Sequence, residues 1–148
     1  MNSIKPTGKY CVSVYGPEGL KSSWEGPNVV TTVGKEFMAS FLKSAALAAA
    51  TFTAKYIAVG TGTGAEVVGD TGMGTELARH TGTVSYTSGG IYNVTATFPT
   101  GTAVGAVIEF GLFSTATGGT LLSRNVKAAA YNVTSADHIV VNYAMTLS

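Results

Sequence analysis

Short alternating segments from Gly82 to the end of the sequence constrain the fold more than any other feature. Apolar and polar residues alternate there in brief stretches that are separated by glycine, serine and threonine. This period of two is typical of strands that bury one face of a sheet. The stretches read TVSYTS, IYNVTATF, AVIEFGLFST, GTLLSRNV and HIVVNYAMTL. The sequence therefore predicts a mainly β fold, with a hairpin turn over residues 114–120.

Extended segments also occupy much of the first half of the chain. KYCVSVY at residues 9–15 alternates, a turn follows at residues 16–19, and LKSSWEGPNVVTT at residues 20–32 continues the extended pattern. YIAV at residues 56–59 is predicted to be another strand, whereas GTELARH at residues 74–80 is predicted to hold one helical turn.

One long helix is predicted over residues 33–50, with Thr31 or Thr32 as its N-cap. Apolar residues recur at helical spacing and form one face: Phe37, Met38, Phe41, Leu42 and Ala45. The tail SAALAAA, residues 44–50, has small residues on every side. We expect this end to pack closely against the sheet or against a neighbouring subunit.

These elements together predict the architecture. Roughly seven or eight short strands and one helix indicate a single-domain antiparallel β-sandwich or flattened barrel, with the helix of about residues 33–50 packed on it. A chain of 148 residues is of the size that builds one hydrophobic core. Residues 1–8 have no periodicity, so we expect a flexible amino-terminal arm before a domain of residues 9–148.

The chain is poor in charge. Charged residues make up 11% of it, against about 25% in typical soluble domains, and the net charge is +1. No basic surface for nucleic acid or an anionic membrane is indicated, and no apolar run is long enough to span a bilayer. The single cysteine, Cys11, excludes an internal disulfide and is interpreted as a small buried hydrophobe. A surface with so few charges predicts that neighbouring subunits cover part of it.

The strand at residues 56–59 runs into Gly60-Thr61-Gly62-Thr63-Gly64, which is similar to the start of a phosphate-binding loop. A dinucleotide fingerprint needs a further glycine and an immediate helix, and a P-loop needs lysine followed by serine or threonine. Neither pattern follows this loop, so no cofactor is expected. We predict instead that Gly60 and Gly62 take positive φ and turn the chain.

The titratable residues indicate no catalytic or metal site. His80 and His138 have no second ligand at metal-binding spacing, and Asp137 faces the opposite side of a strand from its neighbour His138. Three acids in and after the glycine loop lack the spacing of a calcium site and are interpreted as solvated: Glu66, Asp70 and Glu76. We therefore expect no catalytic, cofactor-binding or metal-binding residue and no enzymatic activity.

Two further sites are candidates for structural or interface roles. Glu76 and Arg79 lie three residues apart, so they are expected to pair on one helical turn or to contact another subunit at the rim of an interface. In the segment EFGLF, Phe110 and Leu112 share a face that we assign to the core. Gly111 between them is interpreted as a point of close approach by the helix or a neighbouring backbone.

Aromatic residues leave two alternatives open. Trp24 precedes Glu25-Gly26-Pro27 and is interpreted as a partly buried anchor. In the alternative, Trp24, Tyr86 and Tyr92 are exposed on loops and touch a receptor or a glycan.

Four segments, in their order along the chain, form a recognisable set: NVVTTVGKEFMASFL (28–42), YIAVGTGT (56–63), DTGMGTELAR (70–79) and IEFGLFSTATGGTLLSR (108–124). This set resembles small virion structural proteins of tailed bacteriophages and the amino-terminal, particle-attaching region of phage tail-collar fibre proteins. The resemblance covers about residues 28–126. Met73 stands where leucine is common in the pattern, and the acidic-to-basic spacing at residues 76–79 is compressed.

The resemblance implies a non-enzymatic virion protein, assembled in the host cytoplasm, that associates with itself as a homotrimer and contacts other virion proteins. A capsid decoration (cement) protein docked on the major capsid protein is the first expectation, because no fibre shaft follows residue 148. The alternative is a tail, baseplate or fibre-attachment component bound to tail proteins, and a receptor-binding tip is a further one. Neither nucleic acid nor a membrane is an expected partner.

Overall fold

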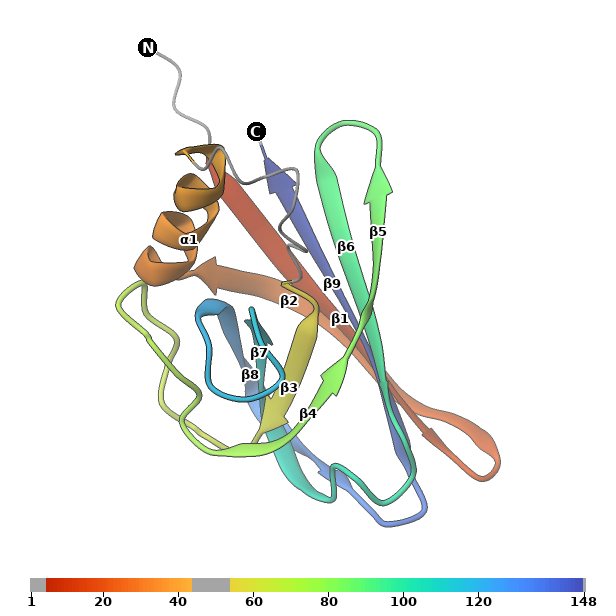
Figure 1. Ribbon diagram of the computed structural model, residues 1–148. Helices are drawn as coiled ribbons and strands as arrows, with labels where there is room; N and C mark the ends of the chain where they lie inside the picture. Colours follow the sequence, from red (N-terminus) through yellow and green to blue (C-terminus); the bar gives the residue numbers. More distant parts are fainter. Residues whose placement is uncertain (1–4, 44–53, 148) are drawn as a thin grey trace.

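A nearly closed antiparallel sheet forms most of the molecule (Figure 1). The computed structural model describes residues 5–43 and 54–147, which hold nine strands and one helix. The strands lie in the order β4-β3-β7-β8-β2-β1-β9-β6-β5. The elements are β1 (Pro6–Gly16), β2 (Gly19–Val30), α1 (Thr32–Lys43), β3 (Tyr56–Gly60), β4 (Glu76–Thr81), β5 (Thr83–Thr87), β6 (Ile91–Phe98), β7 (Gly105–Phe113), β8 (Leu121–Val133) and β9 (His138–Leu147). The predicted mainly β, barrel-like fold with one packed helix is confirmed.

The two ends of the sheet meet at Gly82. β4 pairs with β3 and β5 pairs with β6, yet the two strands follow each other directly in the chain. The Gly82 N–H donates to the Lys55 carbonyl over 2.6 Å, and a Cβ at this position would collide with the Val94 side chain. Because glycine leaves that space free, one extended segment can change partner here and bring the two ends of the sheet together.

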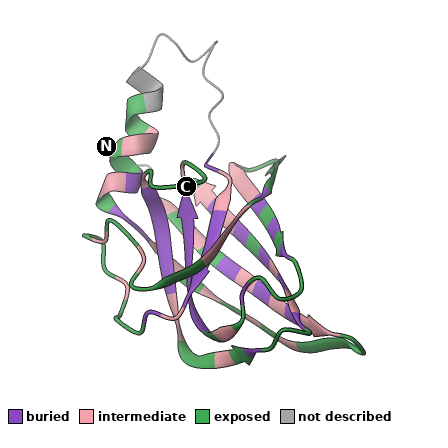
Figure 2. Cartoon of the chain, turned by 60° about the horizontal axis from the view of Figure 1, so that its bottom comes forward, coloured by how far each residue is buried: buried purple, intermediate pink, exposed green. Residues whose placement is uncertain are grey.

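The core lies inside the barrel, where buried and exposed residues alternate along several strands (Figure 2). The Tyr10 ring lies 5.0 Å from the Tyr143 ring and 5.9 Å from the Phe110 ring, measured between centroids. Phe110 and Leu112 are fully buried, as the alternation predicted. β1, β7 and β9 therefore share one apolar core, although they are distant in sequence.

Thr31 is the N-cap of α1. Its hydroxyl accepts a hydrogen bond from the Gly34 N–H over 3.0 Å and donates to the Leu121 carbonyl over 2.5 Å, so the cap also fastens the helix to β8. Phe37 and Met38 pack against the core, as predicted. The rest of the predicted apolar face and the small-residue tail, residues 41–50, lie outside the residues whose side chains are described. Among the described residues, no helix is long and apolar enough to cross a membrane.

Two local predictions are wrong. The segment predicted to hold a helical turn, residues 74–80, mostly forms β4, because β3 offers it a pairing edge that its own sequence does not reveal. The predicted flexible arm of residues 1–8 overlaps β1: Pro6, Thr7 and Gly8 pair with β9, and Gly8 also pairs with β2. Residues 1–4 lie outside the described part.

The predicted hairpin between β7 and β8 is confirmed. Gly118 and Gly119 have φ of 60° and 76°, and the Ser114 N–H donates to the Thr120 carbonyl over 3.1 Å. Positive φ at two successive residues is the conformation that favours a glycine pair in a tight turn.

Candidate functional site: the glycine loop and its buried ion pair

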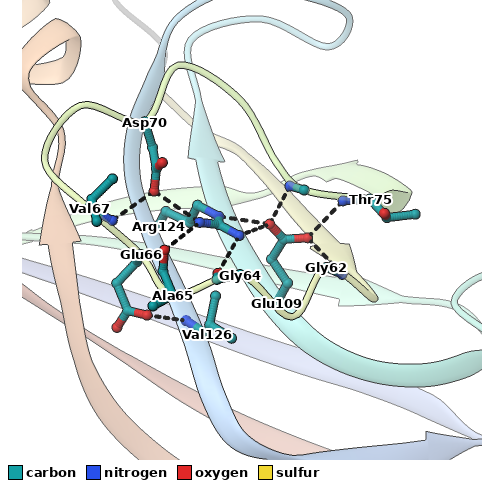
Figure 3. A network of polar contacts seen from close by, with 11 residues as sticks. Gly62, Gly64, Ala65, Glu66, Val67, Asp70, Thr75, Glu109, Arg124 and Val126 are labelled. Carbon is teal, nitrogen blue, oxygen red and sulfur yellow. Dashed lines mark hydrogen bonds and ion pairs between the residues drawn. The ribbon is translucent and has the colours of Figure 1, made fainter.

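The loop between β3 and β4, residues 61–75, is called the glycine loop from here on. It folds around a buried carboxylate (Figure 3). Glu109 lies on β7 beside Gly60 and is fully buried. Its two oxygens accept hydrogen bonds from three backbone N–H groups: Gly62 at 3.1 Å, Gly74 at 2.5 Å and Thr75 at 3.1 Å. The carboxylate therefore gathers the beginning and the end of the loop.

Arg124, on the neighbouring strand β8, completes the arrangement (Figure 3). Its guanidinium contacts Glu109 at 2.7 Å and Asp70 at 2.9 Å, and it donates to the carbonyls of Gly64 at 2.9 Å and Ala65 at 3.3 Å. Burial acts to lower the pKa of Arg124, but the hydrogen bonds to Asp70 and Glu109 outweigh it and raise this pKa above its ordinary value. The guanidinium therefore carries its charge and holds the middle of the loop, while Glu109 holds the ends.

The loop acids are bound rather than solvated, which corrects the prediction for Glu66 and Asp70. Asp70 accepts the Val67 N–H at 2.9 Å in addition to its ion pair, and Glu66 accepts the Val126 N–H at 3.3 Å. Both residues are half-buried. Sequence spacing could not predict this, because the partners on β8 lie far along the chain.

The predicted positive φ at Gly60 and Gly62 is wrong, because neither residue is among the glycines with positive φ. These positions require glycine for space. A Cβ at Gly60 would collide with the Thr75 carbonyl, and one at Gly62 would lie 2.8 Å from the Gly74 Cα. The two ends of the loop thus run backbone against backbone, joined by a bond of 2.9 Å from the Thr61 N–H to the Thr75 carbonyl.

Glu76 and Arg79 do pair, at 2.7 Å, but on a strand rather than on a helical turn. Residues three apart on a regular strand face opposite sides, and here the register of β4 shifts beside Val59 and Gly60, which brings the pair to one side. Arg79 also lies 3.5 Å above the Phe113 ring and donates to the carbonyls of Thr115 and Gly118 at 2.9 Å and 2.8 Å. It therefore fastens the β7–β8 hairpin to β4.

Gly111 is a point of close approach, as predicted, but by a side chain of the loop. A Cβ there would lie 2.7 Å from the Met73 sulfur and 3.1 Å from a Leu121 methyl group. Neither the helix nor another backbone is the neighbour. Met73 thus packs over the sheet beside the ion pair and adds an apolar contact to the polar ones.

Trp24 is a partly buried anchor, as predicted. It packs against the core with its ring 5.8 Å from Phe110 and 6.1 Å from Tyr131, and the Lys127 ammonium lies 4.1 Å above it. The Tyr92 hydroxyl donates to the Ala54 carbonyl over 2.6 Å, and burial raises the pKa of Tyr92 to about 12. Of the three aromatic residues considered for a binding tip, Tyr86 alone is widely exposed, at 75%.

The glycine loop therefore binds an anion, and that anion is a carboxylate of its own chain. Backbone N–H groups that would face a phosphate in a nucleotide site here face Glu109. The Arg124 guanidinium donates hydrogen bonds to Glu109, Asp70 and the carbonyls of Gly64 and Ala65. No group of three or more His, Cys, Asp or Glu side chains is placed to hold a metal ion within residues 5–43 and 54–147.

Sequence reasoning missed the Glu109–Arg124 pair. The available signal was a glutamate inside the apolar run AVIEFGLF and an arginine inside LLSRNV, on two strands predicted to form a hairpin, in a chain with few charges.

Comparison with known proteins identifies no family: no protein-family model, curated protein or solved structure matches this chain.

Proposed function

We propose that the chain is a non-enzymatic structural protein of a tailed-phage virion, namely a capsid decoration (cement) protein. In this role it associates as a homotrimer in the host cytoplasm and docks on the major capsid protein. The proposal rests on the sequence resemblance. One structural observation supports it: three backbone N–H groups of the glycine loop and the Arg124 guanidinium all bond to Glu109 of the same chain. These groups are engaged within the chain, which suits a structural role for the loop.

The exposed surface supports docking by shape and apolar contact. Large hydrophobic side chains are exposed at several places on the described surface: Leu20, Val67, Val68, Leu77, Val84, Tyr86, Val104 and Leu147. Val67 and Val68 lie together in the loop, where the Val68 carbonyl accepts the Thr32 N–H over 2.7 Å. This bond fixes an apolar loop segment beside the start of α1, which suits a contact with a neighbouring protein.

A tail, baseplate or fibre-attachment role is the second candidate, because the same sequence segments resemble the attachment region of tail-collar fibres. A receptor-binding tip has less support, since Trp24 and Tyr92 are half-buried and engaged within the fold.

Electron microscopy of virions that carry a labelled copy of the chain tests the proposal. Label over the shell, retained on filled heads at moderate salt, is the expected result, because apolar docking is little affected by ionic screening. Label confined to tails would select the second candidate. Purified particles without the chain would contradict both.

A further inference from the structure

β5 is the most exposed strand of the sheet. All five of its residues, Thr83 to Thr87, are exposed, and among the described residues it pairs with β6 alone. Its other edge therefore presents backbone N–H and C=O groups that no described strand uses. This edge belongs to neither the glycine loop nor its ion pair.

The sequence of β5 lacks the features that prevent an edge strand from pairing with another chain. Natural edge strands are protected by charged residues, proline or a bulge. TVSYT contains no charged residue and no proline, and its register with β6 is regular. β4, at the other end of the sheet order, differs: it carries Glu76, Arg79 and His80, and its register with β3 is shifted.

The segment is also complementary to itself. In an antiparallel pair centred on Ser85, Thr83 of one copy would lie opposite Thr87 of the other, and Val84 opposite Tyr86. This register pairs all five residues of both strands. Val84 is 42% exposed and Tyr86 is 75% exposed in the single chain. In this register each Tyr86 pairs with the Val84 of the other copy, and aromatic–β-branched pairs are a favoured cross-strand combination.

We infer that two copies of the chain associate edge to edge through β5, antiparallel, about a two-fold axis at Ser85. The partner is thus a second copy of this chain, and the contact is isologous. A five-residue edge is a small interface, so the dimer dissociates on dilution. This contact is separate from the proposed trimer and does not depend on a role in the virion.

Cysteine cross-linking of the full chain tests both the edge and its register. In a Cys11→Ser background, Ser85→Cys places two thiols opposite each other across the axis, and mild oxidation is expected to give a covalent dimer. Leu20→Cys, which is also exposed but lies on β2, serves as the matched control and is expected to give no covalent dimer. Equal cross-linking of the two variants would overturn the inference.

Light scattering gives a second readout without cysteines. Tyr86→Lys removes both aromatic–β-branched pairs, so we expect the dimer dissociation constant to rise about tenfold. Leu20→Lys should leave it unchanged. Tyr86 and Leu20 are both exposed, so neither substitution should disturb the fold. A melting temperature equal to that of the wild type would show that each variant is folded. A wild-type chain that stays monomeric at all accessible concentrations, or dimers that Tyr86→Lys does not weaken, would refute the contact.

Discussion

Glu109 bonds to both ends of the glycine loop and to Arg124. Its buried carboxylate satisfies three backbone donors and neutralises Arg124, which has Asp70 as its other acidic partner. Removing one member of a buried ion pair is costly because the other charge stays buried without its partner. A change of charge at this position therefore affects the whole loop.

We expect Glu109→Gln to lower the free energy of unfolding by about 3 kcal/mol, since the amide cannot accept all of these bonds or balance Arg124. Urea unfolding followed by circular dichroism measures the change. Glu18→Gln, in the exposed turn between β1 and β2, is the control and should stay within about 0.5 kcal/mol of the wild type. A comparably small effect at Glu109 would mean that the pair contributes nothing to stability.

Gly62 and Gly64 allow a test of why glycine is needed at Gly62: because a side chain has no room there, rather than because the backbone φ is positive. A Cβ at Gly62 would press on the Gly74 backbone, whereas one at Gly64 meets nothing within 4 Å, and neither residue has positive φ. We expect Gly62→Ala to cost about 1–3 kcal/mol, as overpacking does. Gly64→Ala should be neutral or slightly stabilising, because it restricts the unfolded chain. Similar unfolding midpoints for the two variants would contradict this reading.

At the scale of elements, α1 depends on the sheet as much as on its own sequence. Gly34 lies so close to β8 that a Cβ there would be 2.6 Å from the Leu122 Cα, and the Thr31 cap donates to β8 as well. One threonine therefore serves the helix terminus and the contact between helix and sheet.

Thr31→Ala should lower stability by about 1–2 kcal/mol, because it removes the N-cap and the bond to the Leu121 carbonyl together. Thr32→Ala is the matched control: Thr32 is the first residue of α1, is exposed, and should change stability little. Thermal unfolding of both variants measures the difference. If Thr32→Ala were the more damaging change, the cap assignment would be wrong.

At the scale of the whole molecule, an ion pair joins distant parts of the chain at one end of the barrel. Lys21 on β2 contacts Asp137, in the turn before β9, at 2.9 Å, and Asp137 also accepts the Thr134 N–H at 2.8 Å. The Thr134 backbone bond and then the Lys21 bond hold the pKa of Asp137 below its ordinary value of 3.8.

The lowered pKa of Asp137 determines how the stability of the fold changes with pH. Because the folded state favours the carboxylate, the stabilisation is present above pH 3.8 and is lost as the pH falls through the lower folded-state value. Asp137→Asn should therefore be less stable than the wild type at pH 7, and the difference should shrink below about pH 4. Chemical unfolding at a series of pH values measures it. A difference independent of pH would exclude the ionised carboxylate as its cause.

Local signals in the sequence determined the type of most elements. Alternation predicted most of the strands, though not β4, and assigned Phe110 and Leu112 to the core. The glycine pair predicted the β7–β8 hairpin, and Thr31 was one of two predicted caps. These features depend on residues a few positions apart, so their physical cause lies within the segment itself.

The tertiary structure alone decided where segments find partners. β4 is a strand because β3 lies beside it, Gly8 belongs to the sheet because β2 and β9 flank it, and Gly60 lacks a side chain because Thr75 occupies the space. Glu109 and Arg124 meet the glycine loop across long separations in the chain. Such contacts depend on which strands become neighbours, and that choice is made by burial of the whole core rather than by any one segment.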